Sequence, residues 1–197
     1  MGFPFRSEKL IKYLTGRFLF GGVFPTDGYI AGVPKNVFRE TNSVGNIGTG
    51  LDTLRSFTFP PKSFKIDQQD YFKFLIGGGF GSNDDDKRIQ LEFGGNVIAN
   101  TTLLDLDSNG YFWTGCIFRL SVTQVNIIIS ALSGNTRIDS LGAISSSGSE
   151  MKMHSHNILT VNNMDTNNND FVLKAESATA TDNNIINNIW IGEMVRF

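Results

Sequence analysis

From about residue 50 to its end, the sequence consists of short apolar segments separated by turn residues, without helical periodicity. Representative segments are YFKFLIGGGFG, RIQLEFGGNVIAN and GYFWTGCIFRLSVT. The pair Gly94-Gly95 in the second of these is typical of a two-residue β-hairpin turn. A series of about eight or more short strands with turns at regular spacing indicates a β-sandwich or barrel. We therefore predict an all-β protein with a jelly-roll β-sandwich over residues 49–197.

The chain closes with the apolar segment NNIWIGEMVRF, although chain ends are usually solvated. In an extended conformation, one face of this segment is apolar except for Glu193: Ile189, Ile191, Val195 and Phe197. The opposite face, with Trp190 and Met194, is half apolar. This pattern predicts a strand that lies inside the sandwich or against a partner, with the isoleucine face buried.

Two predicted strands, FKFLIGGGF and NIIISAL, are apolar on both faces. This is more apolar surface than a two-layer sandwich of this size requires, and an oligomer contact would account for the surplus. The glycine-rich run from Gly77 to Gly81 is not a nucleotide-binding loop, because nothing helical follows it. We expect these glycines to let a backbone or a bulky ring approach closely, with Trp113 as a candidate for that ring.

Charged residues make up only 18% of the 197 residues, and the net charge is −2. This balance argues against nucleic-acid binding, which needs a broad basic surface. Asn, Ser, Thr and Gly supply the polarity instead, and such neutral surfaces suit proteins that are packed into an assembly. No apolar run approaches the roughly 18 residues of a membrane span, so we expect no membrane insertion. Cys116, the single cysteine, is predicted to be a small buried hydrophobe.

The first 48 residues differ from the rest, and we interpret them as an extended N-terminal arm. The segment SEKLIKYLTGRF allows one short helix, with Ser7 as its N-cap. The following segment, FLFGGVFPTDGYIAGVPKN, is apolar but is interrupted by Gly and Pro too often for a regular element. Because such a stretch cannot bury itself locally, we expect it to lie along another surface, on its own domain or on a neighbouring subunit.

Several structural features of residues 45–197 follow one another in a recognisable order. They are Gly48-Thr49-Gly50, Pro60, Gly79-Phe80-Gly81, the turn from Asn83 to Asp86, Lys87 and Phe93-Gly94-Gly95. With the later aromatic strand and the apolar closing strand, this order resembles a jelly-roll module of tailed-bacteriophage virion proteins, found in tail fibres, head fibres and capsid decorations. The shared motifs are structural rather than catalytic. The resemblance implies a homotrimer on a viral surface, with an N-terminal segment fixed to the virion.

On this resemblance we expect a non-enzymatic structural protein that is located in the virion. Its partners would be further copies of itself and other capsid or tail proteins, and a fibre tip would also contact host glycan or protein. The basic, apolar arm fits the anchoring role. The predicted virion-anchoring residues are Arg6, Lys9, Leu10, Ile11, Lys12, Leu14, Arg17, Phe18 and Phe20.

A free carbohydrate-binding module is the alternative, because exposed aromatic rings stack on sugar faces. The candidate rings are Tyr111, Trp113 and Trp190, for which core packing is the competing interpretation. A free module has no need of an arm, so the arm favours the virion protein. A glycan-cleaving enzyme is a third class, but the spacing of the carboxylates singles out no acid–base pair. The carboxylates considered are Glu92, Asp105, Glu150 and Glu176.

Two acidic clusters resemble cation sites only in part, and we expect no cofactor. DLDSNG, which starts at Asp105, opens like a calcium loop, but Cys116 stands where the closing glutamate belongs. An Asn109-Gly110 hairpin turn explains the same residues. The run from Asp84 to Asp86 fits a solvated turn.

His154 and His156 are weak metal-binding candidates. Residues two apart on a strand point the same way, and two imidazoles make half a site at best. On a threefold axis they would become six, which is enough for an octahedral transition metal. Exposed histidines in a polar strand are the simpler interpretation, so we predict no metal site.

Overall fold

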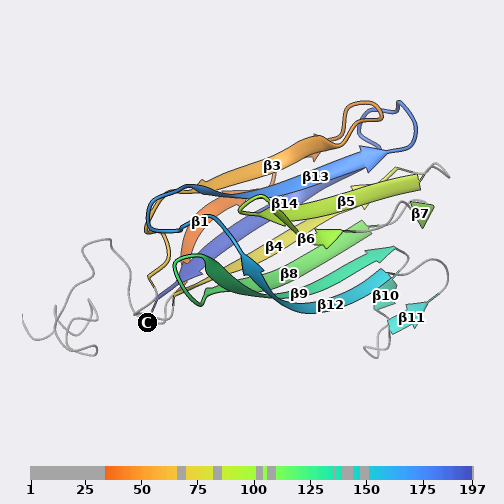
Figure 1. Ribbon diagram of the computed structural model, residues 1–197. Helices are drawn as coiled ribbons and strands as arrows, with labels where there is room; N and C mark the ends of the chain where they lie inside the picture. The colour runs from red at the N-terminus through yellow and green to blue at the C-terminus, as the bar shows by residue number, and fades with distance from the viewer. Residues whose placement is uncertain are drawn as a thin grey trace, which may run out of the picture.

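The structure, a computed structural model, describes residues 34–65, 70–81, 86–100, 104–105, 110–134, 136–138, 144–146 and 151–196. For residues 104–105, 131–134, 136–138, 144–146 and 151–156 only the backbone is described. The helix predicted within SEKLIKYLTGRF lies outside these ranges. The described part is all-β, as predicted, and its two antiparallel sheets pack face to face (Figure 1).

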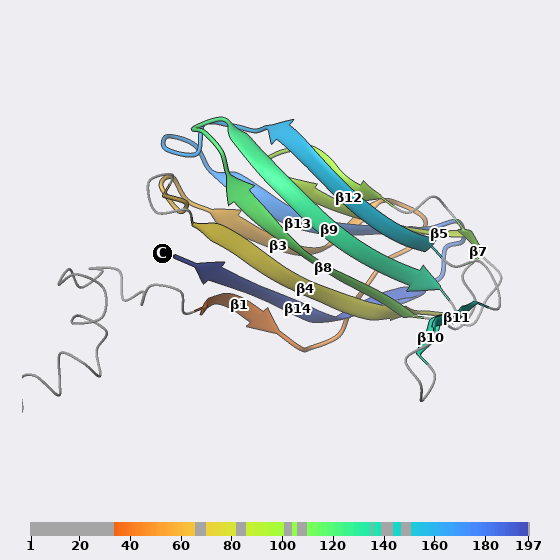
Figure 2. The same cartoon turned by 90° about the horizontal axis from the view of Figure 1, so that it is seen from below.

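The larger sheet has seven strands within the described residues. In spatial order they are β1 (Lys35–Glu40), β14 (Ile185–Val195), β4 (Tyr71–Phe80), β8 (Gly110–Arg119), β9 (Gln124–Gly134) and β12 (Met151–Thr160), with β2 (Val44–Gly45) also paired with β14. The smaller sheet contains β3 (Asp52–Phe59), β13 (Asn169–Ser177), β5 (Asp86–Phe93) and β6 (Asn96–Asn100), with β7 (Leu104–Asp105) beside β5. A separate hairpin is formed by β10 (Thr136–Ile138) and β11 (Ile144–Ser146). Figure 2 looks onto the larger sheet, with the smaller sheet behind it.

The order of the strands is that of a jelly roll. Four strands of the larger sheet, β1-β14-β4-β8, face four of the smaller sheet, β3-β13-β5-β6. The late strands β13 and β14 thus lie inside their sheets, next to the early strands β3 and β1, as in a double Greek key. β9 and β12 widen the larger sheet beyond this pattern. The predicted jelly-roll β-sandwich is confirmed.

Strands β1 and β2 fall within the 48 residues that the sequence predicts to be an arm. Both pair with β14, and Phe38 of β1 packs against the core. Arg55 of β3 holds this region from the opposite sheet, because its Nε donates to Asn187 Oδ1 at 3.0 Å and its guanidinium pairs with Glu40. Residues 35–45 are therefore part of the sandwich, and the rest of the predicted arm lies outside the described residues.

Inward-facing side chains of the two sheets meet in an aromatic core. Trp190 of β14 is fully buried, and its ring centroid lies 4.8 Å from that of Phe38 and 5.0 Å from that of Phe171. Because Phe171 belongs to β13, these three rings join the two sheets. Further rings of this core are Phe59, Phe64, Phe72, Phe74 and Phe93. Aromatic side chains bury large areas, so this cluster contributes much of the hydrophobic stabilisation.

The closing strand β14 is an inner strand, as predicted, but the face that points into the core is the opposite one. Trp190 is fully buried, whereas Ile189 and Ile191 lie on the outside of the sheet and are half-buried. Of the predicted face, Val195 is buried, with 1% exposed. The register explains the difference, since Trp190 lies opposite Ile76, which is an inward residue of β4. In a strand that is apolar on both faces, alternation alone does not select the core face.

Gly78 of β4 lies where two groups crowd the strand. A Cβ at this position would lie 1.9 Å from the Ile186 carbonyl oxygen and 2.6 Å from the Tyr111 hydroxyl oxygen. β14 bulges at this place, immediately after Asn187. The predicted steric role of the glycines is confirmed here, but the approaching ring is that of Tyr111 and not of Trp113.

Replacing Gly78 by alanine is expected to destabilise the protein, because the added methyl group has no space between the β14 backbone and the Tyr111 ring. Overpacking of this kind costs about 1–3 kcal/mol. Gly50→Ala is the matched control, because a Cβ there would lie 3.9 Å from its nearest neighbour, the Asp52 carboxylate. The urea midpoints of the two variants measure the difference. Equal midpoints would show that β14 and the Tyr111 ring can move aside without lowering the free energy of unfolding.

Candidate interaction surface

The outer face of the smaller sheet carries paired charges. On β13 and β5, oppositely charged side chains lie either directly opposite each other or diagonally across the two strands. Arg88 pairs with Glu176, and Lys174 Nζ lies 2.7 Å from Glu92 Oε1. All four side chains are partly exposed. Cross-strand ion pairs of this kind are typical of a sheet face in contact with water.

The outer face of the larger sheet is different, and the strand register defines its rows. One row is Ile191, Leu75, Thr114 and Ser130; the next is Glu193, Lys73, Cys116 and Ile128; the third is Val195, Tyr71, Phe118, Asn126 and Ile158. Phe112 lies beside the first row, opposite Gly77. We call this surface the apolar face and define it by Tyr71, Leu75, Phe112, Cys116, Phe118, Ile128, Ile158 and Ile191. It spans β14, β4, β8, β9 and β12.

Three large side chains of the apolar face are exposed. They are Phe112 of β8, Ile128 of β9 and Ile158 of β12, which are 44%, 46% and 60% exposed. Tyr71 and Phe118 lie in the same row as Ile158, on β4 and β8, and their ring centroids are 5.2 Å apart with planes inclined by 29°. These two half-buried rings therefore cover part of each other's faces. Single exposed apolar residues are common, but a group that is continuous over neighbouring strands marks an interaction surface.

The charges among the described side chains of this outer surface are few and of both signs. Lys73 of β4 and Glu193 of β14 are direct cross-strand neighbours. Arg39 of the edge strand β1 lies opposite Ile191. Adjacent opposite charges cancel at a distance, so the surface produces no strong field of one sign. It is therefore unsuited to a highly charged partner such as nucleic acid.

Cys116 lies near the centre of the apolar face and is half-buried, not buried as predicted. This partial burial raises the pKa of its thiol, and the positive charge of Lys73 lowers that pKa only in part. A thiol with a raised pKa is a weak nucleophile at neutral pH. The residue thus contributes to the surface as a small, largely apolar side chain.

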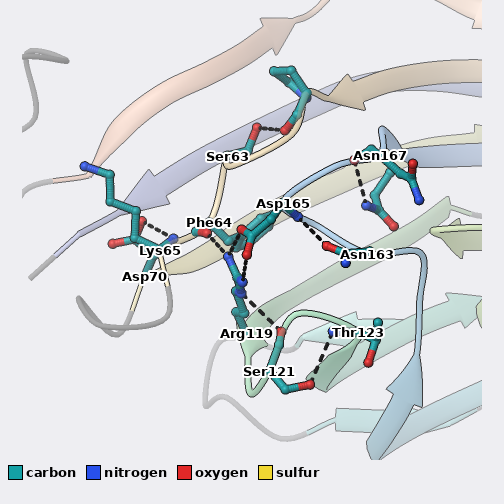
Figure 3. A network of polar contacts seen from close by, with 12 residues as sticks. Ser63, Phe64, Lys65, Asp70, Arg119, Ser121, Thr123, Asn163, Asp165 and Asn167 are labelled. Carbon is teal, nitrogen blue, oxygen red and sulfur yellow. Dashed lines mark hydrogen bonds and ion pairs between the residues drawn. The ribbon is translucent and has the colours of Figure 1, made fainter.

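Arg119 organises the end of the sandwich at which β8 turns into β9. Two of its nitrogens bind the two carboxylate oxygens of Asp165, each at 2.9 Å. The same guanidinium donates to the carbonyl oxygens of Phe64 and Ser121 (Figure 3). One buried side chain thus ties together the connections β3–β4, β8–β9 and β12–β13. The hydrogen bond from Arg119 holds the pKa of the Asp165 carboxyl below its usual range.

The last described residue is fixed at the same end of the molecule. Arg196 Nε lies 3.1 Å from Asp70 Oδ2, and Arg196 Nη2 donates to the Ser63 carbonyl oxygen at 3.0 Å. The Asp70 carboxylate also accepts a hydrogen bond from the Lys65 backbone amide at 2.9 Å. Burial lowers the pKa of Arg196. A chain end with such partners is tied down rather than frayed.

The three rings that were candidates for sugar stacking are all buried. Tyr111 is 4% exposed, and Trp113 and Trp190 have no exposed surface. Burial raises the pKa of Tyr111 well above its ordinary value, although the nearby Asn187 side chain and the charge of Arg55 oppose this shift in part. Core packing is therefore the correct interpretation of these three residues, and a sugar cannot reach them in the folded subunit.

Two of the four candidate carboxylates have described side chains, and both are paired with cations rather than with each other. Glu92 and Glu176 are each engaged by a cation on the outer face of the smaller sheet. Asp105 lies in β7, opposite Asp86 of β5 in the backbone register. Asp84, Asp85, Glu150 and residues 106–109 of the calcium-like loop lie outside the described residues.

Two further predictions stay predictions. His154 and His156 lie on β12, in register with Ser130 and Ile128, and the structure describes only their backbone. The predicted anchoring residues, from Arg6 to Phe20, lie outside the described residues. Within the residues that are placed, no three His, Cys, Asp or Glu side chains form a group that could hold a metal ion. A helix long and apolar enough to cross a membrane is likewise not found in that part.

Comparison with known proteins gives a structural similarity but no match in sequence. No protein-family model and no curated protein sequence matches the chain. Among solved structures, the chain is similar to the CBM2 module of the evolved Dit of Lactobacillus casei BL23 phage J-1, with a TM-score of 0.32 and 13% sequence identity. The match covers 70% of this chain and 67% of that one. A similarity of this degree carries no argument about what the present chain binds.

Two functional features were reached only in part from the sequence. The sequences of β4 and β9 are apolar on both faces, which indicated more apolar surface than the core needs. That this surface lies on the outer side of the larger sheet follows only from the register of five strands. The pair Arg119 and Asp165 was not recognised, because its members lie 46 residues apart in the chain. The feature of the sequence that could have pointed to it is the arginine at the end of the apolar strand GYFWTGCIFR.

Asp165→Asn is expected to lower the stability against unfolding at neutral pH. It should also reduce the loss of stability that the native protein undergoes between neutral and acidic pH. Since the pKa of Asp165 is lowered in the folded state, its ion pair contributes stability at neutral pH that is lost as the pH falls through that lowered pKa. Urea midpoints at pH 7 and pH 3 should therefore differ more in the native protein than in the variant. Asp170→Asn is the control, because that carboxylate accepts a hydrogen bond from Thr58 instead of an arginine. An identical acid response of native protein and D165N would contradict the expectation.

Proposed function

We propose that this protein is a non-enzymatic structural protein of a bacteriophage virion. It forms a homotrimer of jelly rolls on the capsid or within a head or tail fibre, and its N-terminal arm anchors it to other virion proteins. The phage assignment is supported by the motifs shared with the virion jelly-roll module. The structural role is supported by the way in which the arm joins the sandwich.

The observation that carries the proposal is the position of that junction. β1 begins at Lys35, which lies opposite Met194 near the end of β14. The Arg119 cluster and Arg196 lie at the same end of the sandwich, because Val195, Tyr71 and Phe118 are neighbours in register there. The arm therefore leaves the body at one end, and Figure 2 shows β1 starting beside the C-terminal end of β14. A body that is held at one end projects with its other end outward.

The junction is also built to transmit force. β1 pairs antiparallel with β14 from Lys35 to Glu40, so a pull on the arm acts along the strands and loads several hydrogen bonds together. The Phe38 ring packs on Trp190 in the core, and Glu40 pairs with Arg55 of the opposite sheet. β1, which follows the predicted anchoring residues in the chain, is thus held by both the aromatic core and the opposite sheet. This arrangement suits a protein that has to stay attached to a particle.

A carbohydrate-binding module is less well supported. The three rings that would have stacked on sugars are buried, and the outward pair Tyr71 and Phe118 cover each other. Binding to an array of host-surface glycans would show that this second function is nevertheless present. The same experiment on virions, with and without the protein, would separate attachment to the host from a purely structural role.

Deletion of residues 1–33 is expected to abolish incorporation into phage particles while the sandwich stays folded, because β1 and its contacts are retained. Particles of the phage that encodes the protein are purified on a density gradient, and the protein is quantified by mass spectrometry. The fold is checked by the thermal midpoint and the β-sheet circular dichroism of the free variant. Absence of the full-length chain from particles, or equal incorporation of both forms, would contradict the proposal.

A further inference from the structure

We infer that the apolar face is buried against a neighbouring copy of the same chain. The inference rests on the proposed function, because it identifies the surface through which the proposed oligomer forms. The face lies outside the core that the two sheets already complete, so its exposed side chains serve no purpose in the fold of a single subunit. Exposed apolar area on this scale is stabilised only when another surface covers it.

The face is large enough to form the apolar centre of a protein–protein contact. Its defining residues lie on β14, β4, β8, β9 and β12, and along β8 they run from Phe112 to Phe118. With strands about 4.8 Å apart and a rise of about 3.3 Å per residue, they cover about 24 by 20 Å. This is about 480 Å², more than half of the about 800 Å² that one partner contributes to an interface of standard size, whose rim is polar. β9 and β12, the strands added to the jelly roll, supply Ile128 and Ile158 and extend the face to this size.

The charges favour a second copy over a charged partner. Lys73 and Glu193 lie side by side on β4 and β14, toward one side of the face. In a trimer each copy contacts its two neighbours with different parts of its surface, so a Lys73 of one copy can meet a Glu193 of the next. Homo-oligomer interfaces are also more apolar than other interfaces, in keeping with Phe112, Ile128 and Ile158.

The contrast with the other sheet identifies the side of the molecule that stays in water. The outer face of β13 and β5 is crossed by the ion pairs of Arg88 with Glu176 and of Lys174 with Glu92. These pairs satisfy their charges within the subunit and leave a hydrated surface. Two copies that associate through the larger sheet would each keep this charged face outward. The chain thus has one solvent side and one subunit side.

The test compares two β-branched residues on opposite outer faces. Ile128 of β9 is 46% exposed on the apolar face, and Val97 of β6 is 51% exposed on the smaller sheet. Light scattering on the full chain should give a trimer for the native protein and for Val97→Lys, and one 21.7 kDa chain for Ile128→Lys. Ile158→Lys is a second variant at a 60% exposed position, in case the first one folds poorly. Circular dichroism confirms that the variants are folded.

The single cysteine gives a readout that does not depend on mass. Cys116 lies opposite Ile128 in register, in the middle of the apolar face. In the oligomer its reaction with an uncharged maleimide should be slow, and in Ile158→Lys, whose new charge lies in another row and farther from the thiol, it should be several-fold faster. In Val97→Lys the rate should equal that of the native protein. The comparison is made at constant pH, because only the thiolate reacts.

Three outcomes would overturn the inference. One is a native chain that is monomeric, and another is an oligomer that persists in both Ile128→Lys and Ile158→Lys. The third is a monomer in which Cys116 becomes reactive only after residues 1–33 are removed, which would show that the chain's own arm covers the face.

The outcomes for the interface and for the proposed function can be told apart. A chain that enters particles but is monomeric in solution would leave the proposed function standing and remove the inferred interface. An oligomer that depends on Ile128 but is absent from particles would support the inferred interface and contradict the proposed function.

Discussion

The contact of Trp190 with Phe38 and Phe171 is the interaction on which the rest of the structure depends. Its three rings come from β14, β1 and β13, so it joins the end of the chain, the beginning of the described chain and the opposite sheet. All other elements are positioned relative to these strands. β4 pairs with the other edge of β14, and β3 and β5 flank β13. The apolar face exists because the same β14 that buries Trp190 turns Ile191 outward.

A common core thus supports two unlike exteriors. Both sheets alternate side chains between inside and outside, and both contribute rings to the interior. The difference lies in the outward positions, where β5 and β13 carry Arg88 and Glu176 while β8 and β9 carry Phe118 and Ile128. This asymmetry cannot be a requirement of the fold, because either exterior is compatible with the same interior. The asymmetry therefore indicates that the two outer faces have different surroundings when the protein functions.

The fold was largely predictable from the sequence, because strand signals, turns and the closing apolar segment all agree on a jelly roll. Gly94 and Gly95 adopt positive φ angles of 55° and 80° and join β5 to β6, as expected of the hairpin. The sequence did not reveal which face of β14 is buried, since Ile189 and Trp190 are both apolar and only the register separates them. For the same reason it indicated an apolar surplus without locating the apolar face. The Arg119 cluster depends on loops that meet only in three dimensions.

The position of β14 also governs the order of events during synthesis. β14 is made after every other described strand, yet it pairs with β1, β2 and β4, and its Met194 lies opposite Lys35. Pairings between residues so distant in the chain are slow to form, because a long loop must close before they are gained. The larger sheet therefore cannot be completed until β14 has been made. Because β14 contributes Ile191 to the apolar face, that face is complete only after the rest of the described sandwich is available.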